Sequence, residues 1–317
     1  TKNIEDYFAA DDAGKDSFLN RWAFRYKYDG RRRSVEKQIP GGSPLYLVYD
    51  KRDRVVMSQD GNQRSANKWS FTKYDALNRP IITGIYVHND SINQAQMSAL
   101  ISTTNFFDTY NGDASSHGYT NTVFPTTNAD SSPLEILSVT YYDNYKFRDD
   151  LAGSSFNYVA GDITGQDTVA FNRVVGLVTG TKTNVLGASD YLWSVNYYDD
   201  KYRDIQRITQ NHKGGFDRVT SKVDFVGKVL ETKSTYSKDS VTSTTIRKRY
   251  EYDHAGRLLK TYHQLNSEPE ILLSATLYNE LGELVTKKLH SEDNGTTFKQ
   301  HVDFRYSIRG WLTRINN

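Results

Sequence analysis

The stretch "YEYDHAGRLLKTYHQL", residues 250–265, decides the fold, because its pattern recurs along the chain. Aromatic residues lead into a four-residue corner, Asp253 to Gly256, and aliphatic residues follow it. Asp begins such a turn well because its side chain bonds to the backbone ahead of it. Gly three positions later supplies a positive φ. The pattern predicts a hairpin whose strands flank a tight corner.

The repeated motif is an aromatic residue, Asp or Asn, two or three variable residues, Gly or Asn, a basic residue and then aliphatic residues. With Phe225 as a displaced aromatic, the late anchors at 198, 225, 252, 278 and 306 are 27, 27, 26 and 28 residues apart. The copy at Tyr28 is interpreted as a shortened one. The residues assigned to the motif are Tyr28, Asp29, Gly30, Tyr49, Asp50, Tyr74, Asp75, Asn78, Arg79, Tyr198, Asp199, Asp224, Gly227, Tyr252, Asp253, Gly256, Arg257, Tyr278, Asn279, Gly282, Tyr306, Gly310 and Trp311.

A single hairpin is not stable in water, so the repeats must stack edge to edge. The sequence therefore predicts an all-β fold, a long antiparallel sheet that curls because sheets twist. We expect a lead-in over residues 1–20, hairpins over 21–83, an insertion over 84–140 and further hairpins over 141–317. The two strands at the ends of such a sheet would have unpaired edges, which predicts self-association or capping by a partner.

The insertion is predicted to hold one short helix near residues 91–107 and then a polar loop over 108–135. Asp90 or Ser91 is a plausible N-cap, and Ile92, Met97, Leu100 and Ile101 form a helical stripe. The helix either covers a sheet face or binds a partner. Further on, "FNRVVGLVTGTKTNV" (171–185) is interpreted as another hairpin, with Gly180 near its turn.

The amino-acid composition limits which classes of function the chain can have. The 317 residues include 23 Tyr, a residue that suits half-buried strands, and no Cys, which excludes disulfides and thiol chemistry. The net charge of +2 is too balanced for a nucleic-acid surface. No apolar run approaches membrane-spanning length. The opening "TKNIEDYF" has neither Met nor a secretory leader, so we expect a piece of a longer protein.

No recognisable catalytic, cofactor or metal motif occurs, so no catalytic, cofactor-binding or metal residue is assigned. The seven histidines form no short-spaced ligand set, and phosphate loops, nucleophile elbows and dinucleotide fingerprints are absent from the sequence. The sequence leaves open the possibility of a carboxylate pair for glycoside hydrolysis. It also leaves open calcium binding by an acidic loop, although no such loop has EF-hand spacing. The Tyr rows are either cross-strand packing or a sugar-binding platform. Lys228 and Arg257 could pair with the turn Asp or stack on a ring, but Glu283 breaks that rule.

The series of motifs resembles the YD repeat of RHS-repeat proteins. "YEYDHAGRLL", "YNELGELV" and "RYSIRGWLTRIN" look especially like members from Bacteroidota, and the resemblance covers about residue 21 to the end. In that family the repeats wind a sheet spirally into a hollow shell, and members include polymorphic toxins, the cocoon of insecticidal toxin complexes and teneurins. The toxin members enclose a C-terminal toxic domain.

The resemblance implies a non-catalytic stretch of shell wall in a secreted or cell-surface protein. Its partners would be the remainder of a longer RHS chain or an enclosed toxin or effector. No RHS-associated core with self-cleaving acidic residues occurs in the sequence, so self-proteolysis and toxicity are not assigned. Two alternatives stay open: an adhesin or carbohydrate-binding module that uses exposed Tyr and Trp, and a glycoside-active enzyme.

Three Asp-Ser/Thr-aliphatic triplets resemble the O-glycosylation motif of secreted Bacteroidota proteins. They begin at Asp90, Asp167 and Asp239. They suggest periplasmic or extracellular residence, and a native-source mass equal to the bare polypeptide would contradict glycosylation.

Overall fold

A computed structural model describes residues 7–8, 10–102, 105–126, 134–151, 155–188, 190–238 and 243–316. It confirms the all-β prediction: the strands form an 18-stranded antiparallel sheet with a few short helices. The chain divides into two compact units. Unit 1 comprises residues 1–141 and 181–191, and unit 2 comprises 142–180 and 192–317.

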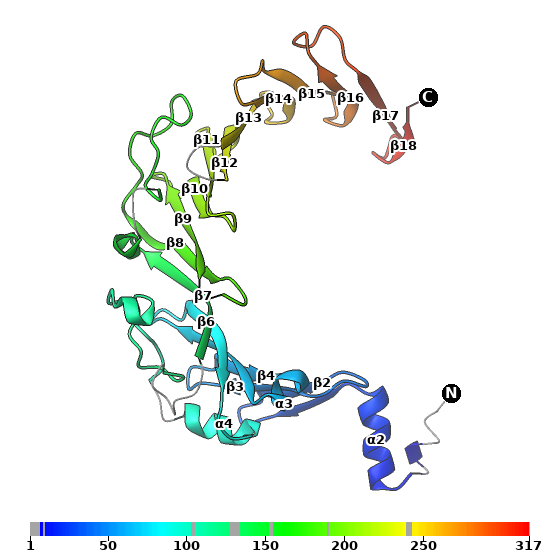
Figure 1. The fold of residues 1–317 in the computed structure, drawn as a ribbon. Coiled ribbons are helices and arrows are strands. Elements are labelled where there is room, and N and C mark those ends of the chain that lie inside the picture. The colour runs from blue at the N-terminus through cyan, green and yellow to red at the C-terminus, as the bar shows by residue number, and fades with distance from the viewer. Residues whose placement is uncertain are drawn as a thin grey trace. The chain divides into compact units, whose positions relative to one another are not determined.

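Unit 1 is a run of hairpins in which each strand pairs with the next along the chain (Figure 1). The loop-rich insertion between β6 and β7 belongs to this unit, while β7 and β8 contribute residues to both units. The strands are β1 (Arg25–Tyr28), β2 (Ser34–Gln38), β3 (Leu45–Tyr49), β4 (Val55–Gln59), β5 (Lys68–Tyr74), β6 (Pro80–Val87), β7 (Leu134–Asp143) and β8 (Val174–Asn184).

Unit 2 continues in the same way, and its ladder is also strictly sequential. In both units the strand register shifts by one residue where a strand enters a motif corner, as between Glu251 and Tyr252. Such a bulge adds local twist. The strands are β9 (Tyr191–Tyr198), β10 (Asp204–Gln210), β11 (Phe216–Val223), β12 (Val229–Ser237), β13 (Ser243–Tyr252), β14 (Leu258–Leu265), β15 (Ile271–Tyr278), β16 (Leu284–Ser291), β17 (Gln300–Tyr306) and β18 (Leu312–Ile315).

The inserted helix is shorter than predicted. It is α4 (Gln94–Ile101), and neither Asp90 nor Ser91 caps it. Asn93 does, because its side chain accepts from the Gln96 backbone while the Gln96 side chain accepts from the Asn93 backbone. The helix ends well before residue 107, and Ile92 lies outside it. Of the predicted stripe, Met97 and Ile101 are buried.

Short helices also occur where none was predicted. The helix α2 (Asp12–Trp22) occupies the N-terminal lead-in, capped by Asp11, and α3 (Gly61–Ser65) follows β4 with a capping box from Asp60 and Gln63. Two 3-10 turns, η1 (Ala114–Ser116) and η2 (Lys146–Asp150), lie in the insertions after β6 and β7. Residues 127–133 of the predicted polar loop lie outside the described part of the chain.

Gly180 does not form a hairpin turn. It lies inside β8, which runs unbroken from Val174 to Asn184. A Cβ at this position would overlap the ring of Phe147, which is buried against the strand. The prediction of a turn was therefore wrong, because this glycine permits close packing rather than a reversal of the chain.

The core lies where insertions cover the sheet. In unit 1, Trp69 and Met57 are buried, and α4 is held to β3 by a hydrogen bond from Gln94 Nε2 to the Leu47 carbonyl, 2.9 Å. By contrast, the described residues after 242 include only four buried ones: Tyr262, Leu272, Thr276 and Ser291. Hydrophobic burial is therefore thin in the later hairpins, and other contacts must hold them together.

The close packing of Gly84 in β6 gives a direct stability test. A Cβ there would overlap the Glu135 carbonyl oxygen and lie 2.6 Å from the Phe71 ring, so we expect Gly84→Ala to cost roughly 1–3 kcal/mol of unfolding free energy. Urea denaturation measures this cost. Gly30→Ala is the matched control, because a Cβ at Gly30 meets nothing within 4 Å. Equal stability of the two variants would contradict the packing.

Candidate functional site

Each motif forms one compact corner, named here by the number of its anchor residue. In corner 252, the Asp253 amide donates to the Arg257 carbonyl at 3.0 Å, and the Gly256 amide donates to the Asp253 carbonyl at 2.9 Å. The Asp253 carboxylate accepts from the Arg257 amide at 2.8 Å and from Arg257 Nε at 2.6 Å. Gly256 has a φ of 80°. The motif thus encodes a turn in which the Asp carboxylate accepts hydrogen bonds from a residue of the same corner.

Eight motif corners of this kind occur in the described part of the chain, each with a left-handed residue three positions after the Asp, Asn or Ser, and the turn from Asn211 to Gly214 between β10 and β11 has the same backbone bonds. Only half of the left-handed positions hold Gly; the others hold side chains that accept about 1–2 kcal/mol of strain. The corner anchors are Tyr28, Tyr49, Tyr74, Tyr198, Val223, Tyr252, Tyr278 and Tyr306, and the left-handed residues are, in the same order, Arg32, Asp53, Asn78, Tyr202, Gly227, Gly256, Gly282 and Gly310.

Two predictions about single corners were wrong. Corner 28 is not shortened: Arg32 rather than Gly30 takes the left-handed conformation, with φ 61°, and Arg33 pairs with Asp29. Nor is Phe225 a displaced anchor. Val223 occupies the anchor position, and Phe225 lies at the tip of the turn with 83% of its side chain exposed. The repeat spacing alone assigned Gly30 and Phe225 to the wrong positions of the turn, because the turn tolerates several residue types at these positions.

Successive corners are joined by their anchor tyrosines. The hydroxyl of each such tyrosine donates to a carbonyl on the preceding hairpin, which in most cases belongs to the residue directly after the basic one. At Tyr49, Tyr74, Tyr252 and Tyr278 the basic side chain also lies over the tyrosine ring, as Arg257 does over Tyr278 at 4.8 Å. The hydroxyl bonds run from Tyr49 to Ser34, Tyr74 to Val55, Tyr198 to Val178, Tyr252 to Val229, Tyr278 to Leu258 and Tyr306 to Leu284, at 2.6–3.0 Å.

We call this set of contacts the corner lock: the hydroxyl bond, the cation over the ring and the ion pair within the corner. Further locks place Arg33 over Tyr49 at 4.7 Å, and Arg54 over Tyr74 at 4.4 Å. A hydroxyl bond contributes about 1 kcal/mol, and an exposed cation–π contact contributes roughly 0.5–1 kcal/mol. Each lock therefore stabilises one hairpin on the next.

Basic side chains also reach from one corner into the next. Arg33 Nη1 lies 2.7 Å from Asp53 Oδ1, Arg54 Nη1 donates to Asn78 Oδ1 at 3.0 Å, and Arg203 Nη1 donates to the Asp224 carbonyl at 2.6 Å. The corners within each unit are therefore linked in a row along one end of the strands.

Corner 278 keeps its internal contact with the polarity reversed. Asn279 replaces Asp and Glu283 replaces Arg, and Asn279 Nδ2 donates to Glu283 Oε2 at 2.7 Å. The Glu283 amide still donates to Asn279 Oδ1 at 2.8 Å. Glu283 departs from the basic-residue rule, as its sequence indicates, but the contact inside the corner is kept because its partner changes with it.

Electrostatics favour the ionised corner aspartates. Burial raises the pKa of Asp199, but hydrogen bonds from the Arg203 backbone and side chain lower it more, so the net shift is downward. In Asp253, the hydrogen bond from the Arg257 backbone is the main cause of a lowered pKa. These carboxylates stabilise the fold above their unfolded pKa near 3.8, and that contribution is lost as pH falls through their lower folded values.

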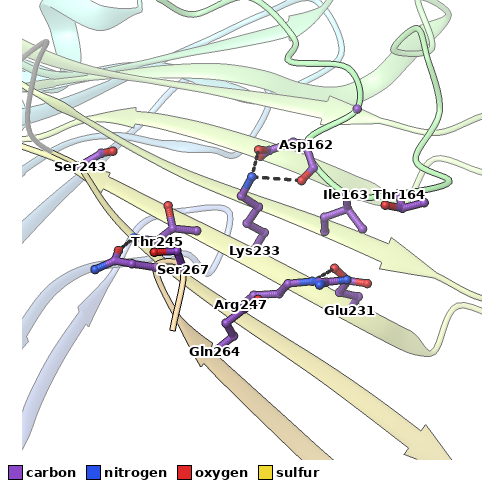
Figure 2. A pocket seen from close by; sticks show the side chains of 12 residues that line it. Asp162, Ile163, Thr164, Glu231, Lys233, Ser243, Thr245, Arg247, Gln264 and Ser267 are labelled. Carbon is purple, nitrogen blue, oxygen red and sulfur yellow. Dashed lines mark hydrogen bonds and ion pairs between the residues drawn. The ribbon is translucent and has the colours of Figure 1, made fainter. Parts of the chain in front are cut away.

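A second polar feature is the groove of unit 2, which has a volume of about 550 Å³ (Figure 2). Asp162 lies on its wall with a nearly buried side chain, and accepts from Arg218 Nε at 2.9 Å and Thr220 Oγ1 at 2.7 Å. Lys233 Nζ lies 2.8 Å from the same carboxylate. Glu231 and Arg247 form a further ion pair across the groove floor. The rest of the lining is mainly hydroxyl and amide groups: Thr164, Ser243, Thr245, Gln264, Asn266 and Ser267.

The Asp162 carboxylate of the groove is held by three hydrogen-bonding partners. Burial raises the pKa of Asp162, but hydrogen bonds from Arg218, Lys233 and Thr220 lower it more. A glycosidase needs one carboxyl with a raised pKa to protonate the leaving oxygen. The Asp162 network instead fixes the loop around residue 162 to β11 and β12.

Unit 1 contains a buried charged cluster that no sequence motif indicates. Lys73 Nζ lies 3.4 Å from Asp108 Oδ2, and both side chains are almost fully buried. Nearby, Lys182 Nζ lies 3.0 Å from His117 Nδ1. Burial, with help from Lys182 and Lys73, lowers the pKa of His117 to about 4. Asp108 and His117 come from the insertion, where no repeat signals their role.

Among the residues that the structure describes, no group of three or more His, Asp or Glu side chains could hold a metal ion. Within the same residues, no helix is long and apolar enough to cross a membrane. Of the Asp-Ser/Thr-aliphatic triplets, those at Asp90 and Asp167 lie in exposed loops, and the one at Asp239 is outside the described residues.

No protein-family model matches the chain, and no curated protein sequence matches it. Among solved structures, the crystal structure of TcdB2-TccC3-Cdc42 aligns with 95% of this chain and 14% of its own, at 9% identity and a TM-score of 0.32. TcdB2-TccC3-TEV and the Photorhabdus luminescens Tc holotoxin pore with substituted TccC3 align at 12% and 11% identity, each with a TM-score of 0.20. This chain spans only 14–20% of those chains. TM-scores this low carry no conclusion about shared structure or activity.

The reversed pair in corner 278 predicts a compensating double mutant. Asn279→Asp alone brings two carboxylates into contact, so we expect it to destabilise the protein. Asn279→Asp combined with Glu283→Arg recreates the common pair and should recover the loss, with a coupling energy on the order of 0.5–3 kcal/mol in a denaturation cycle. Strictly additive effects would contradict the corner pairing.

The lowered pKa of His117 predicts that unit 1 loses unfolding free energy in acid. Its folded pKa of about 4 lies below its ordinary 6.5, so the stability it contributes is complete above pH 6.5 and is lost as pH falls toward 4. We expect His117→Asn, which tolerates the left-handed backbone, to flatten the unfolding free energy over this range. The exposed His254→Asn control should keep the slope, and an unchanged slope in His117→Asn would refute the assignment.

Proposed function

We propose that this chain is a non-catalytic wall segment of a secreted RHS-type protein, which encloses or displays another part of a longer polypeptide. The observation that carries the proposal is the tyrosine hydroxyl bond between successive corners, repeated in both units and built from the motif residues that resemble the YD repeat. A ladder of hairpins joined from one to the next continues a sheet strand by strand, which suits a wall better than a catalytic pocket.

The distribution of charged groups supports the same proposal. The acidic residues of the motif are used inside their own turns, and the two groove acids are paired with Lys and Arg side chains. The chain would act by excluding access to what lies behind it. The enclosed partner would be a toxin or effector segment, and the secreted or cell-surface location belongs to the same proposal.

Limited proteolysis of the full-length polypeptide that contains this chain tests the proposal. We expect a segment outside the sheet to resist protease in the wild type. It should become cleavable in Arg257→Ala combined with Tyr278→Phe, which removes one corner lock. Lys213→Ala, an exposed change at a turn without a lock, should leave protection intact. A polypeptide with no protected segment outside the sheet would contradict the enclosure.

A carbohydrate-binding role is the second candidate, and the groove in Figure 2 favours it. The charged side chains of the groove are paired, so their charges cancel, and hydroxyl and amide groups surround them. Such a lining suits a polyhydroxylated ligand. The anchor tyrosines are a weaker platform, because their hydroxyls and rings are engaged in the corner locks. Glycan-array binding that Thr245→Val abolishes, while Tyr306→Phe leaves it unchanged, would support the groove. An array without bound glycans would reject it.

A further inference from the structure

Lys73 lies on the face of β5 that packs into the core of unit 1. It shares this face with Trp69 and Phe71, and all three residues are buried. Its partner on β6 is Ile82, which is also buried. Burial among apolar residues penalises an ammonium ion and lowers the pKa of Lys73, although the Asp108 carboxylate opposes this shift. The lowered pKa favours the neutral amine, which is the nucleophilic form of lysine.

Two polar side chains of the insertion converge on the Lys73 amine. Asp108 Oδ2 lies 3.4 Å from Nζ, and the Asn121 carbonyl oxygen Oδ1 accepts a hydrogen bond from Nζ at 3.3 Å. The carbon Cγ of Asn121 is one bond, about 1.2 Å, from that oxygen, so the amide carbon is close to the amine. Enzymes hold reacting atoms roughly 3–3.5 Å apart before attack. A nucleophile, a carboxylate and an electrophilic amide are therefore gathered at one point.

The Asp108 carboxylate is oriented by the loop around it. Its Oδ1 accepts hydrogen bonds from the Thr122 amide at 2.8 Å and from the hydroxyls of Thr120 and Thr122 at 2.8 and 2.9 Å. Among the described residues, no hydrogen bond of normal geometry reaches Oδ2, which faces the Lys73 amine. Asp108 is fully buried, so bulk water does not compete for this oxygen. Oδ2 is therefore placed to exchange protons with the amine.

We propose that Lys73 and Asn121 join in an intramolecular isopeptide bond, with Asp108 as the catalytic residue that moves protons. Asp108 Oδ2 takes one proton from the ammonium, and the neutral amine attacks Asn121 Cγ to form the Nζ–Cγ bond. The proton on Asp108 then passes to Nδ2, and the carboxylate takes the excess proton from Nζ. The Cγ–Nδ2 bond breaks, and ammonia leaves with that last proton as ammonium. Asp108 ends as it began, and no other reactant is consumed.

The isopeptide bond fastens the insertion to the sheet of unit 1. It links positions 48 residues apart along the chain, and such a cross-link stabilises a fold by restricting the unfolded chain. An amide also replaces a buried ammonium, whose charge is costly in the interior. The chain has no Cys, so a disulfide cannot do the same. The bond lies within unit 1 and needs no partner, so it forms whether or not the chain encloses anything.

Intact-mass spectrometry and peptide mapping of the whole chain test the bond. We expect the wild type to be lighter than its sequence by one ammonia, and its digest to contain the Lys73 and Asn121 peptides joined by an amide. The joined peptide decides, because a succinimide at an Asn-Gly step loses the same mass. Asn121→Ala, at a half-buried position, should have its full sequence mass, whereas Lys68→Arg, at the exposed start of the same strand, should keep the joined peptide. Separate, unmodified peptides from the wild type overturn the proposal.

Substitution of Asp108 tests its catalytic role. An amide cannot take the proton from the amine, so we expect Asp108→Asn to reduce the joined fraction by about tenfold or more. The comparison uses protein whose circular dichroism matches that of the wild type. Asp108→Ser is measured beside it, because its smaller side chain leaves room for water next to Lys73 if the asparagine variant does not fold. Joining at the wild-type level in either folded variant overturns the catalytic role of Asp108.

Discussion

The hydroxyl bond from each anchor tyrosine to the preceding hairpin is the contact on which the later sheet depends. After residue 242 the described strands bury few side chains, so hydrophobic burial alone contributes little to the stability of this part. The corners there add a tyrosine hydroxyl bond at Tyr252, Tyr278 and Tyr306, and a cation over the ring at Tyr252 and Tyr278. At about 2 kcal/mol per lock, several locks approach the total stability of an ordinary domain.

The lock explains why the motif has its particular order. An Asp, Asn or Ser precedes the turn and accepts its amides, the left-handed residue follows three positions later, and a basic residue after it is long enough to reach the neighbouring ring. Corner 278 reverses which side chain donates and keeps the contact, so the constraint is complementarity within the corner rather than residue identity. The same residues that form the turn also position the next hairpin.

The sequence was sufficient for the all-β fold and most corners, because both follow from local turn chemistry repeated many times. It placed Phe225, Gly30 and Gly180 incorrectly, since spacing cannot tell an anchor from a turn tip or a turn glycine from a packed one. The groove at Asp162 and the buried Lys73–Asp108 pair arise from insertions that meet the sheet far along the chain, and no local pattern predicts those contacts.

Hydrogen exchange measured by mass spectrometry on Tyr252→Phe tests the coupling between hairpins most directly. The substitution removes one hydroxyl that joins β13 to the carbonyl after corner 223. If the corner lock couples hairpins, amides of β11 and β12 will lose protection together with those of β13 and β14. A change confined to the residues around position 252, or no change at all, would contradict the account.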